Sequence, residues 1–278
     1  TEEGGTEGGG DGAERLRRLI RPLILRRTKK AVAPELPPKE ELLQYADAGK
    51  RQTQVYESLR LRFAEEVEEL IRSGEQGKSA MKILEAMLRL RQAAILPVLV
   101  DRTYADVPSA KLDLLYDRLL ELRDEGNKAL VFSQFTGVLD DVETRLSGTG
   151  LGLYRLEGKT PRADRERGIA GFQAAEAAAV FLISLKAGGV GINLTAADYV
   201  FLLDPWWNPA VESQAIDRAH RIGREGSVFA YRLVTAGTIE EKMLRLQERK
   251  RRISESLIRG ESGALRELTN DEILGLFR

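Results

Sequence analysis

The 278-residue sequence lacks several features that would place it in a common class of protein. It contains no cysteine, which excludes disulfide bonds and thiolate metal sites. Its single histidine leaves little for a metal centre. No apolar run approaches the roughly 20 residues that a membrane-spanning helix needs, and the N-terminus has no signal-peptide core. We therefore expect a soluble, intracellular protein with no metal site of its own and no membrane partner.

The chain also lacks a net charge, because 43 basic residues balance 43 acidic ones. Contact with nucleic acid would therefore depend on local basic patches rather than on a global field. One such patch lies at 14–30, where arginines and lysines are spaced among leucines and isoleucines. By itself this patch fits the solvated basic face of an amphipathic helix. Residues 1–12, rich in glycine and glutamate, are predicted to be disordered.

A glycine-rich turn between two apolar runs is the most informative part of the sequence. The run 180–184 shows no polar alternation, which is typical of a strand buried on both faces in a parallel sheet. Three glycines in 186–193 allow the backbone to come close to a phosphate or to another backbone. A second apolar run occupies 199–203, and Pro209 then suits the first turn of a helix.

That helix is expected to present Gln214, Arg218 and Arg221 from one face, because they lie at i, i+4 and i+7. Two guanidiniums on one face are costly to hold together unless an anion lies between them, and the planar fork of arginine matches phosphate oxygens. We therefore predict a nucleotide phosphate as the ligand, with a structural double salt bridge as the alternative. His220 is expected to be a hydrogen-bonding spacer rather than a general base.

These patterns resemble motifs five and six of superfamily-two helicases, in the SWI/SNF branch of DNA translocases. The resemblance covers the glycine-rich loop with its tail at 192–195, the triplet 207–209 and residues 214–223. It implies that Arg218 and Arg221 are arginine fingers that complete an ATP site. The nucleotide-binding residues that it implies are Gln214, Gly189, Gly191 and Asn193.

The flanking sequence alternates between strand and helix patterns. Strands are predicted at 128–132, 153–156 and 228–233, with helical patterns between them, as in right-handed crossovers. With the central stretch they predict an α/β fold: a RecA-like parallel sheet with helices on both faces. Polar residues that follow such strands should share one rim, which binds the DNA backbone in the family. The implied DNA-binding residues are Ser133, Gln134, Lys159, Thr160, Lys186, Ala187, Gly188, Trp207 and Asn208.

Some of the rim residues also fit structural roles. Ser133 and Thr160 suit helix N-caps, a role that can coexist with phosphate contact. Trp207 matches the tryptophan that the family lays against the DNA groove, whereas Trp206 is expected to pack on the sheet rim. Asp204 resembles a magnesium-holding carboxylate, but no second acid follows it, so a structural cap at this turn is favoured.

Helical patterns at 50–71 and 79–94 precede the core, and the second ends near Leu90-Arg91-Gln92, which resembles the family's protrusion. Thr238 and Glu241 form a capping-box pattern before a basic helix, which is either a brace helix or a solvated helix. We expect the chain to divide into a disordered segment at 1–12, a basic connector at 13–48, a helical protrusion at 49–108, the RecA-like core at 109–235, and a brace helix with a C-terminal helix at 236–278.

The sequence contains neither a GxxxxGK[ST] phosphate loop nor a strand that ends in Asp-Glu. The closest approaches, at 74–79 and 158–160, lack the first glycine of the template. We therefore predict the C-terminal motor lobe of an ATPase that depends on double-stranded DNA. It would bind ATP and Mg²⁺ only together with the first RecA-like lobe and would be inactive alone. The implied partners are double-stranded DNA, that first lobe and a DNA-bound protein complex.

A function from a different class stays open, namely a non-catalytic DNA- or protein-binding module with a helicase-like fold. Such a module would be indifferent to Arg218 and Arg221. An RNA-remodelling helicase is disfavoured, because the triplet 207–209 and the brace segment resemble the DNA branch. The sequence of residues 205–210 resembles that of bacterial members of the family. We therefore expect a cytoplasmic protein associated with the nucleoid, or a nuclear one if the source is eukaryotic.

Overall fold

The computed structural model describes seven stretches of the chain, and for a few helical positions only the backbone. The stretches are 37–73, 76–187, 192–205, 209–221, 224, 226–254 and 269–277, with backbone alone at 73, 76–79 and 249–254. The segment predicted to be disordered and most of the predicted basic connector lie outside the described residues.

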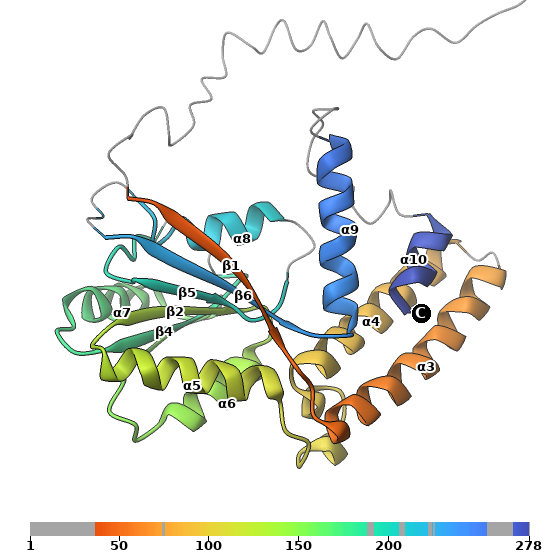
Figure 1. Ribbon diagram of the computed structural model, residues 1–278, viewed down its shortest axis with the longest axis horizontal. Coiled ribbons are helices and arrows are strands. Elements are labelled where there is room, and N and C mark those ends of the chain that lie inside the picture. Colours follow the sequence, from red (N-terminus) through yellow and green to blue (C-terminus); the bar gives the residue numbers. More distant parts are fainter. Residues whose placement is uncertain are drawn as a thin grey trace, which may run out of the picture. The chain divides into compact units, whose positions relative to one another are not determined.

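A six-stranded sheet forms the centre of the described chain (Figure 1). Its spatial order is β1-β6-β5-β2-β4-β3, and every neighbouring pair is parallel. The all-parallel sheet confirms the predicted α/β class. The strands are β1 (Lys39–Ala46), β2 (Lys128–Ser133), β3 (Gly152–Leu156), β4 (Ala179–Ser184), β5 (Tyr199–Leu202) and β6 (Val228–Thr235).

Helices cover both faces of this sheet, as predicted. On one face lie α5 (Ala110–Asp124) and α6 (Thr136–Leu146), and on the other lie α7 (Arg162–Ala174) and α8 (Pro209–Ile216) (Figure 1). Successive side chains of a strand point to opposite faces, so each buried strand contributes to two cores. Val131 packs with the α5 and α6 side, whereas Leu130 and Phe132 pack with the α7 and α8 side.

Strand β1 occupies residues that the sequence analysis assigned to the connector. It pairs with β6 from Lys39 opposite Val228 to Ala46 opposite Thr235. Because it forms an edge of the sheet, it shows little of the burial that marks the central strands. Its leucines and tyrosine stay exposed, at 39% for Leu42, 47% for Leu43 and 46% for Tyr45. A strand without a buried face leaves no clear pattern in the sequence.

The remaining helices pack together at the side of the sheet. They are α3 (Lys50–Ser73), α4 (Gln76–Ile95), α9 (Ile239–Ser254) and α10 (Asn270–Phe277), with short 3-10 helices η1 (Pro97–Leu99) and η2 (Arg102–Tyr104) leading back to α5. Leu90 of α4, Met243 of α9 and Phe277 of α10 are buried in one apolar cluster. The predicted protrusion and the predicted C-terminal helices therefore share a core. Among the described residues, no helix has both the length and the apolar character needed to cross a bilayer.

The start of α9 shows the predicted capping box with one shift. The N–H of Glu240 donates to Thr238 Oγ1 at 3.3 Å, so Thr238 caps the helix as predicted. Glu241 reaches back to the N–H of Gly237 at 3.0 Å, one residue before the expected donor. The first bond satisfies a backbone N–H that the first helical turn leaves without a partner, and the second ties the preceding residue to the helix.

Candidate nucleotide and DNA interface

The segments that follow β2, β3, β4 and β5 leave the sheet at the same side, which we call the carboxyl edge. The strand register sets this arrangement, because Ser133 lies opposite Ser184, Leu156 opposite Ile183, and Phe132 opposite Leu202. Backbone hydrogen bonds extend it past the strands, from Leu185 N–H to Ser133 O at 2.9 Å and from Leu203 N–H to Phe132 O at 3.0 Å. The common rim predicted from the sequence is therefore present.

Two lysines of the carboxyl edge face solvent. The Lys159 side chain is 87% exposed and lies 3.4 Å from Glu157 Oε2. Lys186 is also exposed, directly after β4. Gln134 and Thr160 are half-buried beside them. The edge therefore presents cationic and polar groups that an anionic polymer can reach.

Two other predicted DNA-binding residues offer no side-chain surface. Ser133 is fully buried, and its Oγ accepts a hydrogen bond from the N–H of Phe135 at 3.0 Å. Ala187 is 2% exposed, and its N–H donates to Ser184 O at 2.8 Å. In this structure their contribution is to shape the loops, so any contact with DNA would pass through the backbone.

Neither Ser133 nor Thr160 is a helix N-cap, which corrects the structural alternative considered for them. Helix α6 has Phe135 at its N-cap and α7 has Pro161, and neither cap makes a side-chain hydrogen bond. Thr160 Oγ1 instead accepts from the N–H of Glu157 at 2.9 Å and closes the turn after β3. Six other residues that the sequence analysis discussed lie outside the described residues: Gly188, Gly189, Gly191, Trp206, Trp207 and Asn208.

The two predicted arginine fingers lie beyond the end of a helix rather than on its face. Helix α8 begins at Pro209, as predicted, but ends at Ile216, so only Gln214 of the predicted trio lies in it. Turn hydrogen bonds continue the chain, from Arg218 N–H to Ala215 O at 3.2 Å and from His220 N–H to Ile216 O at 3.1 Å. The prediction that all three side chains share one helical face was therefore wrong, because the regular helix ends at Ile216 and turns follow before Arg218.

The two guanidiniums nevertheless influence each other. Arg221 is exposed and Arg218 is half-buried. Burial, and then the positive charge of Arg221, lower the pKa of Arg218 below its usual range. The carbonyl of Arg218 accepts from the N–H of Leu194 at 3.0 Å. The preceding residue, exposed Asn193, therefore lies close to the Arg218 backbone. Two adjacent cations with an exposed amide beside them form a potential anion site.

His220 and Arg224 hold this turn in place from outside. His220 Nε2 lies 2.8 Å from the carbonyl oxygen of Pro37, a contact that fits the predicted hydrogen-bonding role. The guanidinium of Arg224 donates to Thr195 O at 2.7 Å and forms an ion pair with Asp198 at 2.6 Å. The sequence alone does not indicate this role for Arg224, because both partners precede it by more than 25 residues and leave no local pattern.

Asp204 is buried at the end of β5, with no exposed side-chain surface. Its carboxylate accepts from the N–H of Gln134 at 3.2 and 3.1 Å and lies 3.6 Å from Nη2 of Arg91. Burial raises the pKa of Asp204 to about 6, while Arg91, Ser133 and the Gln134 N–H act in the opposite direction. The structural role favoured for Asp204 agrees with this geometry, although its donor belongs to a neighbouring loop rather than to its own turn. Among the described residues, no group of three or more acids and histidines could hold a metal ion.

A second buried charge pair lies next to Asp204. Lys111 of α5 and Glu240 of α9 form an ion pair with no exposed side-chain surface on either residue. Lys111 Nζ also donates to the carbonyl of Leu203 at 2.9 Å, and Glu240 accepts from the N–H of Thr235 at 2.9 Å. This pair cannot be predicted from the sequence, because a lysine and a glutamate 129 residues apart carry no shared local signal. Arg91 had one possible signal, its place in the triplet that resembles the family's protrusion.

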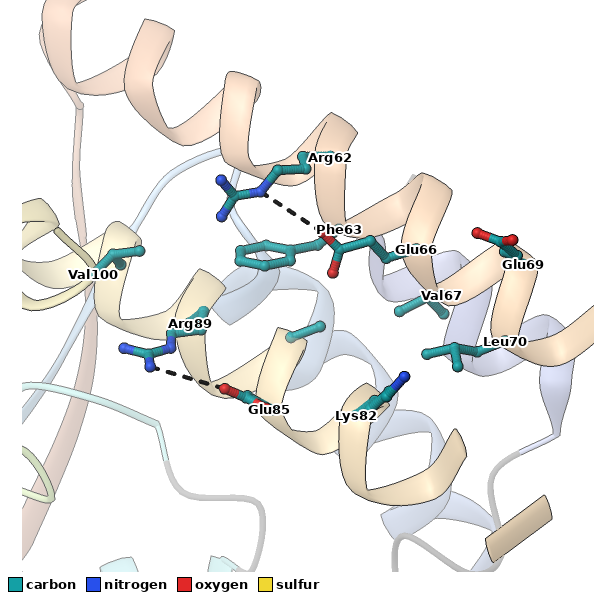
Figure 2. Close-up of a pocket in the computed structure, with 11 residues that line it drawn as sticks. Arg62, Phe63, Glu66, Val67, Glu69, Leu70, Lys82, Glu85, Arg89 and Val100 are labelled. Carbon is teal, nitrogen blue, oxygen red and sulfur yellow. Dashed lines mark ion pairs between the residues drawn. The ribbon is translucent and has the colours of Figure 1, made fainter. Parts of the chain in front are cut away.

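A groove of about 760 Å³ lies apart from these residues, between α3 and α4. Figure 2 shows ion pairs at its mouth, Arg62 with Glu66 and Arg89 with Glu85, both at 3.8 Å. Each arginine at the groove is paired with a glutamate, so the groove carries no excess of positive charge that would attract an anionic ligand. We therefore take the carboxyl edge and the turn around Arg218 as the candidate site.

Comparison with known proteins gives two matching family models. The model of the helicase conserved C-terminal domain matches residues 110–223. The model of the SNF2-related domain matches residues 3–99. Together they cover the helical protrusion and the sheet as far as the predicted arginine fingers.

Individual relatives agree with these models. A human SWI/SNF-related matrix-associated actin-dependent regulator of chromatin, subfamily A member 1, is 35% identical over 95% of this chain and 26% of its own length. An uncharacterized ATP-dependent helicase of Mycoplasma pneumoniae is 37% identical over 92% of this chain and 24% of its own length. The chain thus spans about a quarter of the length of these curated relatives.

Solved structures show the same similarity. The Sulfolobus solfataricus SWI2/SNF2 ATPase core in complex with dsDNA is 30% identical, with a TM-score of 0.70 over 97% of this chain and 57% of that chain. The C-terminal domain of the Sulfolobus solfataricus ATPase is 27% identical, with a TM-score of 0.67 over 85% of this chain and 96% of that chain. The second comparison covers nearly the whole of that C-terminal domain.

Proposed function

The chain belongs to the SWI/SNF family of superfamily-two ATPases, as the C-terminal lobe of such an enzyme, and from this premise we propose that it is a motor lobe of an ATP-dependent double-stranded DNA translocase or remodeller. In this proposal it supplies arginine fingers for ATP hydrolysis and part of the track for the DNA backbone. The observation that carries the proposal is the closeness of two positive side chains, half-buried Arg218 and exposed Arg221. The exposed side chain of Asn193 lies near them, because the N–H of the next residue donates to the Arg218 carbonyl.

The nucleotide side of the proposal depends on charge. Arg218 and Arg221 would contact the phosphates of a nucleotide held by the first RecA-like lobe, where they neutralise charge that develops on the transferred phosphoryl group. Burial and then the charge of Arg221 lower the pKa of Arg218, while the charge of Asp217 raises it, and a phosphate between the two guanidiniums would offset the repulsion from Arg221. Gln214 is exposed on the last turns of α8 and would orient the pair or contact the nucleotide.

ATP and Mg²⁺ are assigned to the complete two-lobe enzyme. This chain's arginines are donors suited to phosphate oxygens, whereas Mg²⁺ requires oxygen ligands such as carboxylates. Asp204, the acid that follows a central strand, is turned toward Arg91 and the Gln134 N–H. The sequence also has no phosphate-loop pattern. We therefore propose that this chain binds neither ATP nor Mg²⁺ by itself and is inactive alone.

The DNA side depends on the carboxyl edge. Lys159 and Lys186 would contact phosphates, with Gln134 and Thr160 as polar neighbours. Gly188, Trp207 and Asn208 are proposed contacts in the loops that follow β4 and β5. The similar Sulfolobus ATPase core forms a complex with double-stranded DNA, which supports the choice of polymer.

The proposed partners follow from these two sides. They are the first RecA-like lobe of the same protein, double-stranded DNA, and a DNA-bound protein complex as the object of remodelling. The human relative is named as a regulator of chromatin. We propose that the protein is located with the cellular DNA, on the nucleoid of a bacterium or in the nucleus of a eukaryote.

The test is the rate of ATP hydrolysis by the two-lobe enzyme with saturating double-stranded DNA. Arg221→Ala should reduce the DNA-stimulated rate by about 10³-fold or more, because an arginine finger is typically worth about 10³–10⁵. Arg162→Ala is the matched control, since Arg162 is 92% exposed on α7 and pairs only with Glu166 among the described contacts. Wild-type hydrolysis in Arg221→Ala would refute the assignment and would favour a non-catalytic binding module.

A further inference from the structure

Arg91 joins the helical protrusion to two separate loops of the carboxyl edge. It lies on α4 and is only 8% exposed. Its Nη2 donates to the carbonyl of Pro205 at 2.6 Å and lies 3.6 Å from Asp204 Oδ2. Its guanidinium carbon lies 5.8 Å from the centre of the Phe135 ring, within the range of a cation–π contact. One side chain therefore contacts both the loop after β2 and the loop after β5.

Asp204 completes the connection from the other side. It accepts from the N–H of Gln134, and thereby fixes the loop after β2 against the end of β5. Lys111 holds the carbonyl of Leu203, one residue earlier, and is itself paired with Glu240. We call these four charged residues, Arg91, Lys111, Asp204 and Glu240, the edge clasp. They come from α4, α5, the loop after β5, and α9.

The composition of the edge clasp suggests a role beyond stability. Removing charges from water costs several kcal/mol per ion, and well-packed apolar residues often stabilise a core as well as a buried ion pair does. Buried ions do impose a defined geometry, because each unsatisfied group would be costly. Here the geometry concerns the two loops proposed to contact DNA. Gln134 donates directly to the clasp, and Trp207 and Asn208 follow Pro205 by two and three residues.

We propose that Arg91 is a positioning residue for DNA engagement, through which the protrusion sets the placement of the loops after β2 and β5. This inference rests on the proposed function, since it specifies how the DNA track is held in shape. The ligand is the phosphate backbone of double-stranded DNA. Arg91 does not contact it but orients the groups that do.

The test compares Arg91→Lys with wild type in the full-length protein. Lysine keeps the charge and the long stem, but one ammonium cannot contact two loops and stack on Phe135 as the planar guanidinium does. The first readout is hydrogen exchange of the segment 133–136, which contains the Gln134 N–H. We expect exchange about tenfold faster, which corresponds to about 1.4 kcal/mol less protection. Segments in β4 should be unchanged.

The second readout is equilibrium binding of a DNA duplex, followed by fluorescence anisotropy without nucleotide. Arg91→Lys should weaken binding by about three- to tenfold while the midpoint of thermal unfolding changes little. Arg89→Lys is the matched control on the same helix. The Arg89 side chain is 39% exposed and contacts Glu85 and Gln92 of its own helix, so neither readout should change.

Two results would overturn the inference. One is unchanged exchange at Gln134 in Arg91→Lys, and the other is faster exchange with wild-type DNA affinity, which would make Arg91 merely structural. If Arg91→Lys does not fold, Asp204→Asn must give the same pair of changes, because it keeps the size of the side chain and loses the charge that faces Arg91. A wild-type protein that binds no duplex would refute the proposed function instead, and Gln134 exchange would still decide whether Arg91 holds the loops.

Discussion

The buried ion pair of Lys111 and Glu240 allows a stability prediction with a defined sign and size. Neither side chain has exposed surface, and each has one further backbone partner, Leu203 O at 2.9 Å for Lys111 and Thr235 N–H at 2.9 Å for Glu240. The variant Glu240→Gln keeps the shape and an acceptor oxygen but leaves the Lys111 charge buried without its direct ion-pair partner, with Asp204 as the remaining negative charge nearby. Breaking a buried pair in this way typically costs about 3–5 kcal/mol.

The expected loss translates into a measurable shift of the unfolding midpoint. For a chain of this size about 1 kcal/mol corresponds to about 2–4 °C, so Glu240→Gln should unfold about 6–20 °C below wild type. The double variant Lys111→Met with Glu240→Gln removes both charges and should recover most of this loss, because buried pairs can often be replaced by neutral groups at little cost. The measurements are thermal unfolding for the midpoint and urea unfolding for the free energy, made on wild type, single and double variants at neutral pH.

The pH dependence distinguishes a buried charge from simple mispacking. Burial lowers the pKa of Lys111, and the charge of Glu240 raises it. Without Glu240 the folded-state pKa falls further below the unfolded value, so the unfolded state binds more protons and stability rises with pH. The deficit of Glu240→Gln should therefore shrink between pH of about 7 and about 10. A deficit that is equal in the single and double variants, and constant with pH, would refute the reasoning.

Three further predictions follow from the same structure. Burial raises the pKa of Asp204 to about 6, above the usual 3.8, so wild type should lose about 3 kcal/mol of stability relative to Asp204→Asn as pH rises from about 4 to about 6, and urea unfolding of the two proteins at both pH values measures this difference. Lys159→Ala and Lys186→Ala should each make the negative slope of log affinity for duplex DNA against log salt less steep by about 0.9, and an unchanged slope would remove that lysine from the proposed track. Gly171→Ala should lower the free energy of unfolding by about 1–2 kcal/mol although alanine favours a helix, because the added carbon would lie 2.8 Å from the Tyr154 ring. A variant as stable as wild type in thermal unfolding would contradict this.

The sequence was sufficient for those parts of the fold where burial leaves a periodic pattern. Strand β4 is buried along its whole length, so its uninterrupted apolar run predicted a central parallel strand. The helices α3 and α4 were likewise predicted from apolar residues at helical spacing. The carboxyl edge followed from topology alone, since parallel strands end on one side.

The site was predicted less completely, because its geometry depends on where elements end. The residues Gln214, Arg218 and Arg221 share a helical spacing, but α8 stops at Ile216 and turn hydrogen bonds take over. Ser133 was predicted as a DNA contact from its position after β2, yet burial turns it toward Phe135. Position in a motif gives the neighbourhood of a side chain but not its direction.

The sequence by itself determined the family, the order of the central strands and helices along the chain, and the identity of the charged groups that surround the proposed site. Only the tertiary structure decided that β1 joins the sheet edge, that α9 and α10 pack with the protrusion, and that Arg91 meets Asp204. Local spacing encodes which face of an element is buried, because burial repeats with the period of the helix or strand. Contacts between residues more than 100 positions apart have no such period, and they form only when the whole chain has closed around them.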